Sequence, residues 1–269
     1  RELSSSIGIR LMPDTANGED NIFDSSSNAD PYLSIINLAR LKKIPLRKQY
    51  NLSDSNIDWM TLSYVARSLQ SYKSRLKVYD FTDMLEIFVN ESSKFCPNLS
   101  VSFIDEAQDL SPLQWDVAHV IEKNSDKIYC AGDDDQAIFR WAGADVDHLV
   151  SISKGNARVL DQSYRIPSSV HEIADKVIRR VKFRTDKSWK PRQEKGQVIS
   201  EASFEHVDLF TGEWLILSRS NYLLNEIDAH CRSLGVYFER KDNPSISEKK
   251  IDAVKNWERL RKGYTVYSE

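Results

Sequence analysis

Residues 99–105 read LSVSFID and residues 127–133 read KIYCAGD, and these two stretches decide the fold. Each is a short run of apolar and β-branched residues that ends in acidic residues, which is typical of a buried parallel strand followed by a loop. Between them, Ser111, Pro112 and Gln114 combine an N-cap, a first-turn proline and a capping-box glutamine, so a helix is expected from Pro112. A strand, a helix and a second strand in this order predict a βαβ unit with a parallel sheet.

The alternation of strands and helices continues toward the C-terminus, while the N-terminal third is helical. Residues 158–164 and 213–219 are apolar enough to be two further strands, each followed by a helix. Helices are expected over 31–41, 55–76, the segment after the N-cap Asp80, the segment from Pro167, and the segment from near Leu223 to Gly235. Residues 1–30, with two serine triplets and few apolar side chains, are expected to be mobile.

Composition narrows the class of protein. At 269 residues, with 41% apolar and 29% charged side chains, the chain is long enough for one or two folded domains. No apolar stretch approaches the roughly 18 residues that a membrane span requires, so no membrane partner is expected. Three cysteines without a CxxC pair favour a reducing compartment, and hence a cytoplasmic location. The net charge of -3 argues against binding that depends mainly on nonspecific attraction to phosphates.

The two predicted strands in the middle of the chain both end in carboxylates. Asp105 and Glu106 follow the first strand, and Asp133, Asp134 and Asp135 follow the second. Because ligands gather at the carboxyl ends of parallel strands, such a pair could hold Mg²⁺ through one acid and activate a water through the next. A solvated acidic loop is the alternative for either group alone. Crowded carboxylates repel one another without a cation, so at least one raised pKa is expected among them.

Five motifs, in order along the chain, resemble those of superfamily 1 helicases of the UvrD/Rep/PcrA-like branch. DEAQD at 105–109 is similar to Walker B, and GDDDQAIFRWAGA at 132–144 is similar to motif III. LDQSYR at 160–165 resembles motif IV, DFTDML at 80–85 the element before Walker B, and WLILSRSN at 214–221 a strand of the second motor domain. The resemblance implies an α/β fold with RecA-like parallel sheets of the P-loop NTPase type and a helical N-terminal insertion.

The resemblance also implies an ATP site. Asp105 would hold Mg²⁺ and Glu106 would act as the general base, while Gln136 would sense the γ-phosphate or the attacking water. Tyr164 would stack on the adenine, and Arg165 would be an arginine finger that stabilises the transferring phosphoryl group. Taken alone, an arginine such as Arg165 more often forms a local salt bridge. The implied cofactors are ATP and Mg²⁺, and all five residues should converge on one cleft between two motor domains.

A DNA site follows from the same resemblance. Phe139 and Trp141 would present aromatic faces to single-stranded bases, and Asn221 is also assigned to the DNA. The implied partner is single-stranded DNA or its junction with a duplex, and the implied activity is ATP-dependent 3′→5′ movement along it. Taken alone, Trp141 would more often be a core residue. Two basic stretches, 40–48 and 176–195, with five and nine Lys or Arg, are either solvated helix faces or a DNA-backbone footprint.

Two positions depart from the family pattern, and the family's phosphate-binding loop and its motifs V and VI do not occur in the sequence. Ala142 stands where motif III usually has arginine, and Ser163 where motif IV usually has asparagine. None of the nine glycines is followed by lysine, so there is no Gly-Lys-Ser/Thr loop to cradle phosphates. The chain is therefore expected to be the central part of a helicase, inactive by itself, with exposed sheet edges that allow self-association.

The resemblance implies four parts and leaves two other functions open. The parts are a helical 1B-like insertion (1–78), motor domain 1A (79–157), motor domain 2A (158–243) and the start of a 2B-like insertion (244–269). The alternatives are a non-catalytic nucleic-acid-binding module derived from a helicase, which the missing phosphate loop would suit, and the helicase part of a helicase–nuclease. Retention of the four residues proposed for ATP chemistry favours a motor, because a binding module needs none of them: Asp105, Glu106, Gln136 and Arg165.

Overall fold

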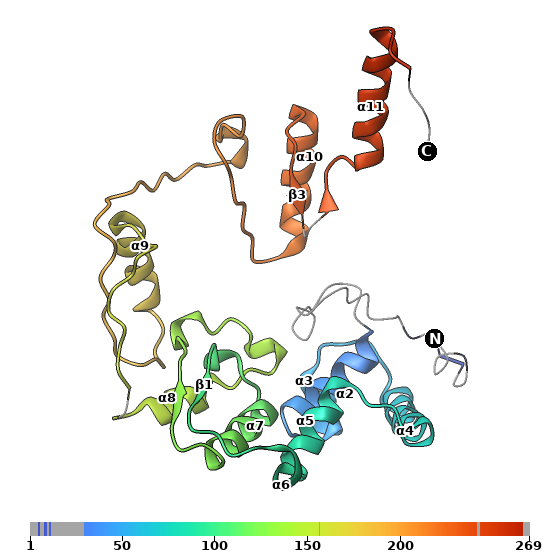
Figure 1. Ribbon diagram of the computed structural model, residues 1–269, viewed down its shortest axis with the longest axis vertical. Helices are drawn as coiled ribbons and strands as arrows, with labels where there is room; N and C mark the ends of the chain where they lie inside the picture. Colours follow the sequence, from blue (N-terminus) through green and yellow to red (C-terminus); the bar gives the residue numbers. More distant parts are fainter. Residues whose placement is uncertain are drawn as a thin grey trace. The chain divides into compact units, whose positions relative to one another are not determined.

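The computed structural model describes residues 30–155, 157–240 and 243–265, together with Ser5, Gly8, Ile9 and Leu11. The chain forms two compact units, Arg1–Gly196 and Gln197–Glu269 (Figure 1). Walker B, motif III and motif IV all belong to the first unit. The expectation of a mobile segment over residues 1–30 lies almost wholly outside the described residues, and the four-part division of the chain stays a prediction.

Helices dominate the first unit. They are α2 (Pro31–Leu41), α3 (Leu46–Leu52), α4 (Trp59–Leu76), α5 (Phe81–Asn90), α6 (Ser92–Phe95), α7 (Pro112–Lys123), α8 (Val146–Ser153) and α9 (Ser168–Ile178), with 3₁₀ turns η1 (Ala107–Asp109), η2 (Asp134–Gln136) and η3 (Arg140–Ala142). The predicted N-caps Asp30, Asp80 and Ser111 are all confirmed, the last two as reciprocal capping boxes. The helix expected from residue 55 begins instead at Trp59, because the side chain of Asp58 caps it.

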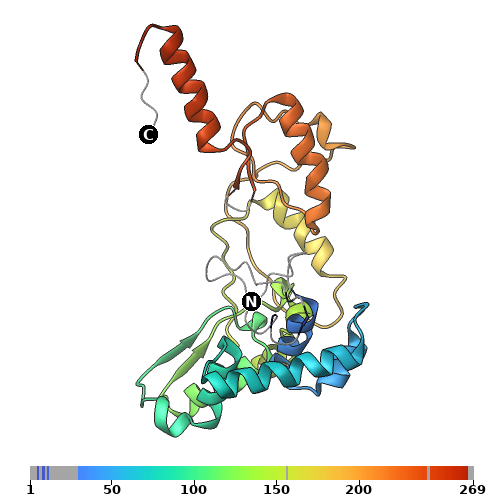
Figure 2. The same ribbon diagram turned by 90° about the vertical axis from the view of Figure 1, so that its right-hand side faces the viewer.

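The N-terminal helices share a hydrophobic core. Ile35 and Ile36 of α2 pack against Leu62 and Val65 of α4, and the last two are fully buried. Figure 2 shows α4 along its length. Burying side chains of this size stabilises the fold by about 1.5–3 kcal/mol each, so this cluster holds α2 and α4 together.

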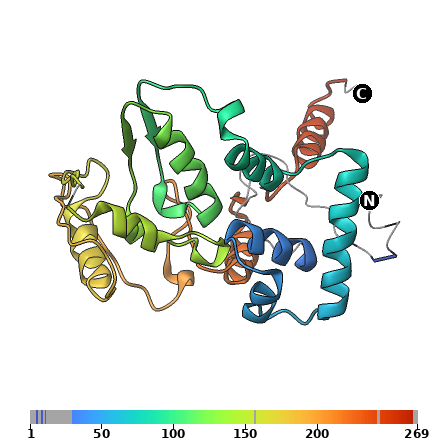
Figure 3. The same ribbon diagram turned by 90° about the horizontal axis from the view of Figure 1, so that it is seen from below.

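The central βαβ unit is formed as predicted. Strands β1 (Ser102–Ile104) and β2 (Ile128–Cys130) pair in parallel, with Phe103 opposite Tyr129. Helix α7 connects the two strands and lies beside them (Figure 3). A second hydrophobic cluster forms around this helix from Ala107, Trp115, Ala118 and Leu149. The carboxyl ends of both strands, where the site was predicted, are therefore held in place by a packed helix.

The predicted strands over 158–164 and 213–219 are wrong for the described residues. The first makes only a single parallel bridge, from Gln162 to Lys190, and the second exposes Leu215 and Leu217 by 83% and 82%. A parallel strand needs hydrogen bonds along its length and helices over its faces. The described residues give 158–164 only that one bridge and give 213–219 none. The α/β class is thus confirmed as a small parallel sheet among helices, whereas a full RecA-like sheet is what the family implies.

The second unit has little buried core in its described part. It contains η4 (Phe204–His206), η5 (Asn221–Leu223), α10 (Leu224–Leu234), β3 (Glu239–Arg240), β4 (Asn243–Pro244) and α11 (Glu248–Arg261). The predicted end of α10 at Gly235 is confirmed, since this glycine takes the left-handed conformation with φ 72°. Strands β3 and β4 form a short antiparallel pair. Among the described helices of both units, none has the length and apolar character needed to cross a bilayer.

Candidate functional site

The Walker B carboxylates lie directly after β1, as the sequence predicts. Asp105 and Glu106 are both exposed. Glu106 adopts the left-handed backbone conformation, φ 50° and ψ 40°, and its amide donates to Asp105 Oδ1 at 2.9 Å. A non-glycine residue in this conformation is strained, and such strain is concentrated at functional sites. The second oxygen of Asp105 suits a cation such as Mg²⁺, which typically takes one or two carboxylates alongside phosphate and water oxygens.

A buried glutamine joins Walker B to motif III. Gln108 is 2% exposed; its Nε2 donates to Glu106 Oε2 at 2.6 Å, and its Oε1 accepts from the amide of Asp133 at 2.9 Å. The absence of a side chain at Gly132 permits this approach, since a Cβ there would lie 2.9 Å from Gln108 Oε1. Gln108 was not among the predicted site residues, although its place as an amide residue inside an acidic motif at a strand end was a signal for such a role.

Motif III continues this connection to the predicted phosphate sensor. Gln136 Nε2 donates to Asp133 Oδ2 at 2.6 Å, and the side chain of Gln136 is exposed. Glu106, Gln108, Asp133 and Gln136 therefore form one continuous series of hydrogen bonds. The structure thus brings together two predicted catalytic residues, Glu106 and Gln136, through two residues that sequence reasoning did not assign.

Two cations from the segment after α9 neutralise the acidic loop of motif III. Lys187 Nζ donates to Asp133 Oδ1 at 2.6 Å and also to Asp134. Arg184 binds Asp135 with two nitrogens, at 2.8 and 2.6 Å. The side chains of Lys187, Asp134 and Asp135 are only 13%, 7% and 12% exposed, so water screens these pairs weakly.

The acidic loop of motif III was expected to have carboxylates that repel one another and so a raised pKa, but Lys187 and Arg184 supply positive charge to it. Burial alone raises the pKa of Asp133, but hydrogen bonds from Lys187 and Gln136 hold that pKa below its ordinary value. At least one raised pKa was expected among the carboxylates after the two strands, but the pKa of Asp133 is lowered because the chain itself supplies the counter-charge. In Walker B, burial and the nearby charge of Glu106 raise the pKa of Asp109.

The motif IV side chains do not join this hydrogen-bonded series. Tyr164 is 84% exposed, and Arg165 is exposed and forms no side-chain hydrogen bond or ion pair with the described residues. If Arg165 had only a structural role, Asp161 would be a nearby partner for it. Asp161 pairs instead with Lys190, at 3.2 Å. Adenine stacking by Tyr164, an arginine finger at Arg165 and their convergence on a cleft stay predictions.

The aromatic residues of motif III lie at η3. Trp141 is 50% exposed and Phe139 is partly buried, with ring centroids 6.1 Å apart. The exposed fraction of Trp141 disfavours the alternative that it is a core residue. Arg140 ties the turn to α8 through Asp147 at 2.6 Å, while Ala142, where the family usually has arginine, is 7% exposed.

The basic stretch 176–195 divides into two sets. Its ion-paired members are Arg179, Arg184, Lys187, Lys190 and Arg192, and four others, Lys176, Arg180, Lys182 and Lys195, have no ion pair with the described residues. The second set is the stronger candidate for a DNA-backbone footprint, because no ion pair with the described residues occupies its charges, and this contact stays a prediction. Asn221 lies in the second unit, where its carbonyl accepts from Arg240 at 2.6 Å, and its contact with DNA stays a prediction.

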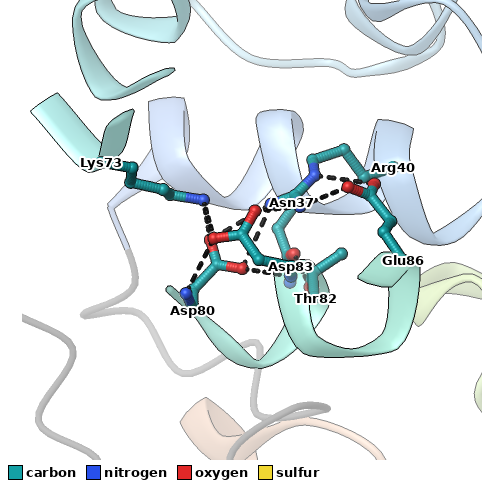
Figure 4. A network of polar contacts seen from close by, with 7 residues as sticks. All are labelled: Asn37, Arg40, Lys73, Asp80, Thr82, Asp83 and Glu86. Carbon is teal, nitrogen blue, oxygen red and sulfur yellow. Dashed lines mark hydrogen bonds and ion pairs between the residues drawn. The ribbon is translucent and has the colours of Figure 1, made fainter. Parts of the chain in front are cut away.

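A second polar network fixes the element that precedes Walker B (Figure 4). Arg40 of α2 binds Asp80, Asp83 and Glu86, with Nη2 2.5 Å from Asp83 and 2.8 Å from Glu86. Lys73 of α4 also binds Asp83, at 2.7 Å, and Asp80. Since Asp80 and Asp83 form the capping box of α5, this network joins three helices at the start of the motif.

Comparisons with known proteins agree with these motifs. Residues 13–156 match the UvrD/REP helicase N-terminal domain. The chain is 28% identical over 236 residues to a probable DNA helicase II homolog of Rickettsia conorii, covering 82% of this chain and 34% of that protein. It is 26% identical over 157 residues to the ATP-dependent DNA helicase PcrA of Staphylococcus aureus, covering 54% of this chain and 21% of that protein. The chain thus spans about a third or less of these curated relatives. Because the matched domain covers more than half of its length, the chain belongs to the UvrD/REP helicase family.

Proposed function

We propose that this chain forms part of an ATP-dependent 3′→5′ DNA helicase that couples ATP hydrolysis to movement along single-stranded DNA. The observation that carries the proposal is the hydrogen-bonded series from Glu106 to Gln136, with Trp141 five residues farther along the same loop. One short loop would then hold Gln136, which responds to the phosphate, and Trp141, which contacts the bases. A change in the bound nucleotide could thereby alter the contact with DNA. The cofactors are ATP and Mg²⁺.

Each residue has a distinct part in the proposed chemistry. Asp105 binds Mg²⁺, which would neutralise charge on the phosphates. Gln108 binds one oxygen of Glu106 and leaves the other free to accept the proton of the attacking water. Gln136 orients that water or the γ-phosphate. From motif IV, Tyr164 stacks on adenine and Arg165 acts as the arginine finger.

The proposed partner is single-stranded DNA or its junction with a duplex. Phe139 and Trp141 supply ring faces, and base stacking on such faces is worth about 1–3 kcal/mol per base. The four basic residues without ion pairs in 176–195 would contact phosphates, and Asn221 would add a polar contact. A cytoplasmic location and self-association through exposed sheet edges stay predictions.

Two other functions share part of this support. A non-catalytic nucleic-acid-binding module would use the same aromatic residues of motif III, Phe139 and Trp141, without the ATP chemistry. The helicase part of a helicase–nuclease would contain the same motifs. For the 269-residue chain by itself we expect ATP turnover with single-stranded DNA far below the ~10 s⁻¹ typical of enzymes, because no lysine of a phosphate loop is present.

The proposal is tested by a titration of single-stranded DNA. The anisotropy of a fluorescein-labelled oligothymidylate is measured against the full chain, its Trp141→Ala variant and a control variant, Trp257→Ala. Trp257 is 69% exposed and lies in the second unit, so its loss should leave affinity unchanged. Loss of Trp141 should weaken binding about tenfold at low and at high salt, because stacking is screened far less than phosphate contacts. Unchanged affinity, or equal losses in both variants, would overturn the proposal.

A further inference from the structure

We infer that residues 184–192 form a strap that couples motif III to motif IV, and that within it Lys187 positions Gln136 through the carboxylate of Asp133. The strap is defined by contacts at both of its ends. Only the role given to Gln136 rests on the proposed function, because the contacts themselves do not depend on it.

The first end of the strap binds motif III. Asp133 is a bridge, since its Oδ1 accepts from Lys187 Nζ and its Oδ2 accepts from Gln136 Nε2, both at 2.6 Å. The backbone amide of Thr185 donates to Asp134 at 2.6 Å, and Arg184 forms the two hydrogen bonds to its aspartate described above. Every carboxylate of the acidic loop is therefore held by the strap.

The second end of the strap binds motif IV through the backbone. The amide of Lys190 donates to the carbonyl of Asp161 at 2.6 Å, and the carbonyl of Lys190 accepts from the amide of Ser163 at 2.9 Å. Farther along, the amide of Arg192 donates to the carbonyl of Ile166 at 2.9 Å. Tyr164 and Arg165 lie between these anchored residues, so the strap constrains the backbone that carries them.

This arrangement gives Lys187 a positioning role. The side-chain amide of Gln136 has two N–H donors, and binding one of them to Asp133 aims the nitrogen while the other stays free for a phosphate or water oxygen. Lys187 holds the Asp133 carboxylate, which in turn orients the amide of Gln136. Because the Lys187 side chain is only 13% exposed, ions from the solvent do not easily replace it. A shift of either motif would thereby reach the other through the strap.

Hydrogen exchange of the full chain, followed by mass spectrometry, tests this coupling. The Lys187→Met variant should exchange roughly tenfold faster over residues 132–142, and also faster over 160–166, because charge-assisted hydrogen bonds are lost at one end of the strap. Lys187→Arg retains the charge and should restore slow exchange in both segments. The matched control is Lys94→Met, which removes an exposed ion pair with Glu91 and should change neither segment.

A second variant covers the case in which Lys187→Met unfolds the chain. Asp133→Asn keeps an oxygen for Gln136 but removes the charge that binds Lys187, so it should loosen the same two segments. Faster exchange confined to residues 184–187, or unchanged exchange in the folded variant, would overturn the strap. If exchange changes as expected while Trp141→Ala leaves DNA affinity intact, the strap is supported and the proposed function fails. If exchange is unchanged while Trp141→Ala weakens DNA binding, only the strap is rejected.

Discussion

Replacing Arg40 with methionine should lower the free energy of unfolding of the first unit by about 2 kcal/mol. The guanidinium of Arg40 contacts three carboxylates, and its side chain is 21% exposed, while that of Asp83 is 14% exposed. Burial alone lowers the pKa of Arg40, but the hydrogen bond to Glu86 and the three negative charges raise it above its ordinary value. The network therefore stabilises the charged arginine in the folded state.

The magnitude follows from what the substitution leaves behind. Lys73 would still neutralise Asp83, but Glu86 would lose its ion-pair partner. Removing one partner of a fully buried pair costs ~3–5 kcal/mol, whereas an exposed pair contributes ~0.2–1 kcal/mol. Because the Arg40 network is neither fully buried nor exposed, a value of about 2 kcal/mol lies between these limits.

Urea denaturation measures this loss if the signal comes from the first unit alone. Trp214→Phe and Trp257→Phe leave tryptophans only in that unit, so fluorescence in this background follows its unfolding. Arg179→Met is the matched control. Arg179 forms an exposed pair with Asp175, four residues away on the chain, so its loss should lower the free energy of unfolding far less than Arg40→Met does. If Arg40→Met costs no more than this control, the network does not hold α5 in place and the reasoning is refuted.

Two further predictions concern acid and close packing. Burial alone would raise the pKa of both Asp83 and Asp133. Lys73 and Arg40 lower the pKa of Asp83 instead, and Lys187 and Gln136 lower that of Asp133. The stabilisation from these two carboxylates is therefore complete above the ordinary value of 3.8 and is lost as pH falls through the lower folded values. Circular dichroism between pH 7 and pH 2 should thus show a loss of stability that begins only near pH 4, and a loss already complete at pH 5 would contradict this assignment. Gly132→Ala should lower the melting temperature, because the added Cβ would lie 2.9 Å from Gln108 Oε1 and 3.0 Å from Leu149 Cδ2. An unchanged melting temperature would mean that the close approach of Gln108 to residue 132 does not require a glycine there.

Features that depend on a few neighbouring residues could be predicted from the sequence. The caps at Asp30, Asp80 and Ser111 and the helix end at Gly235 are decided within one turn of chain, and each is confirmed. The parallel pair β1–β2 could be predicted too, because one helix connects its strands directly.

Features that depend on distant partners could not be predicted in the same way. The segments 158–164 and 213–219 have the apolar pattern of strands, yet a strand forms only where another strand accepts its hydrogen bonds. In the site, Gln108 reaches the amide of Asp133, 25 residues away, and Lys187 reaches its carboxylate across 54 residues. Composition could identify 176–195 as basic, but only the tertiary contacts show that Lys187 neutralises motif III.

Photo-crosslinking tests most directly the central claim that the loop holding Gln136 also binds single-stranded DNA. The 269-residue chain is irradiated with an oligothymidylate that contains 4-thiothymidine, and the crosslinked peptides are identified by mass spectrometry. We expect adducts at Phe139 and Trp141, reduced when unlabelled oligothymidylate competes. Adducts confined to the basic residues after α9 or to the second unit, with none in residues 132–144, would contradict the claim.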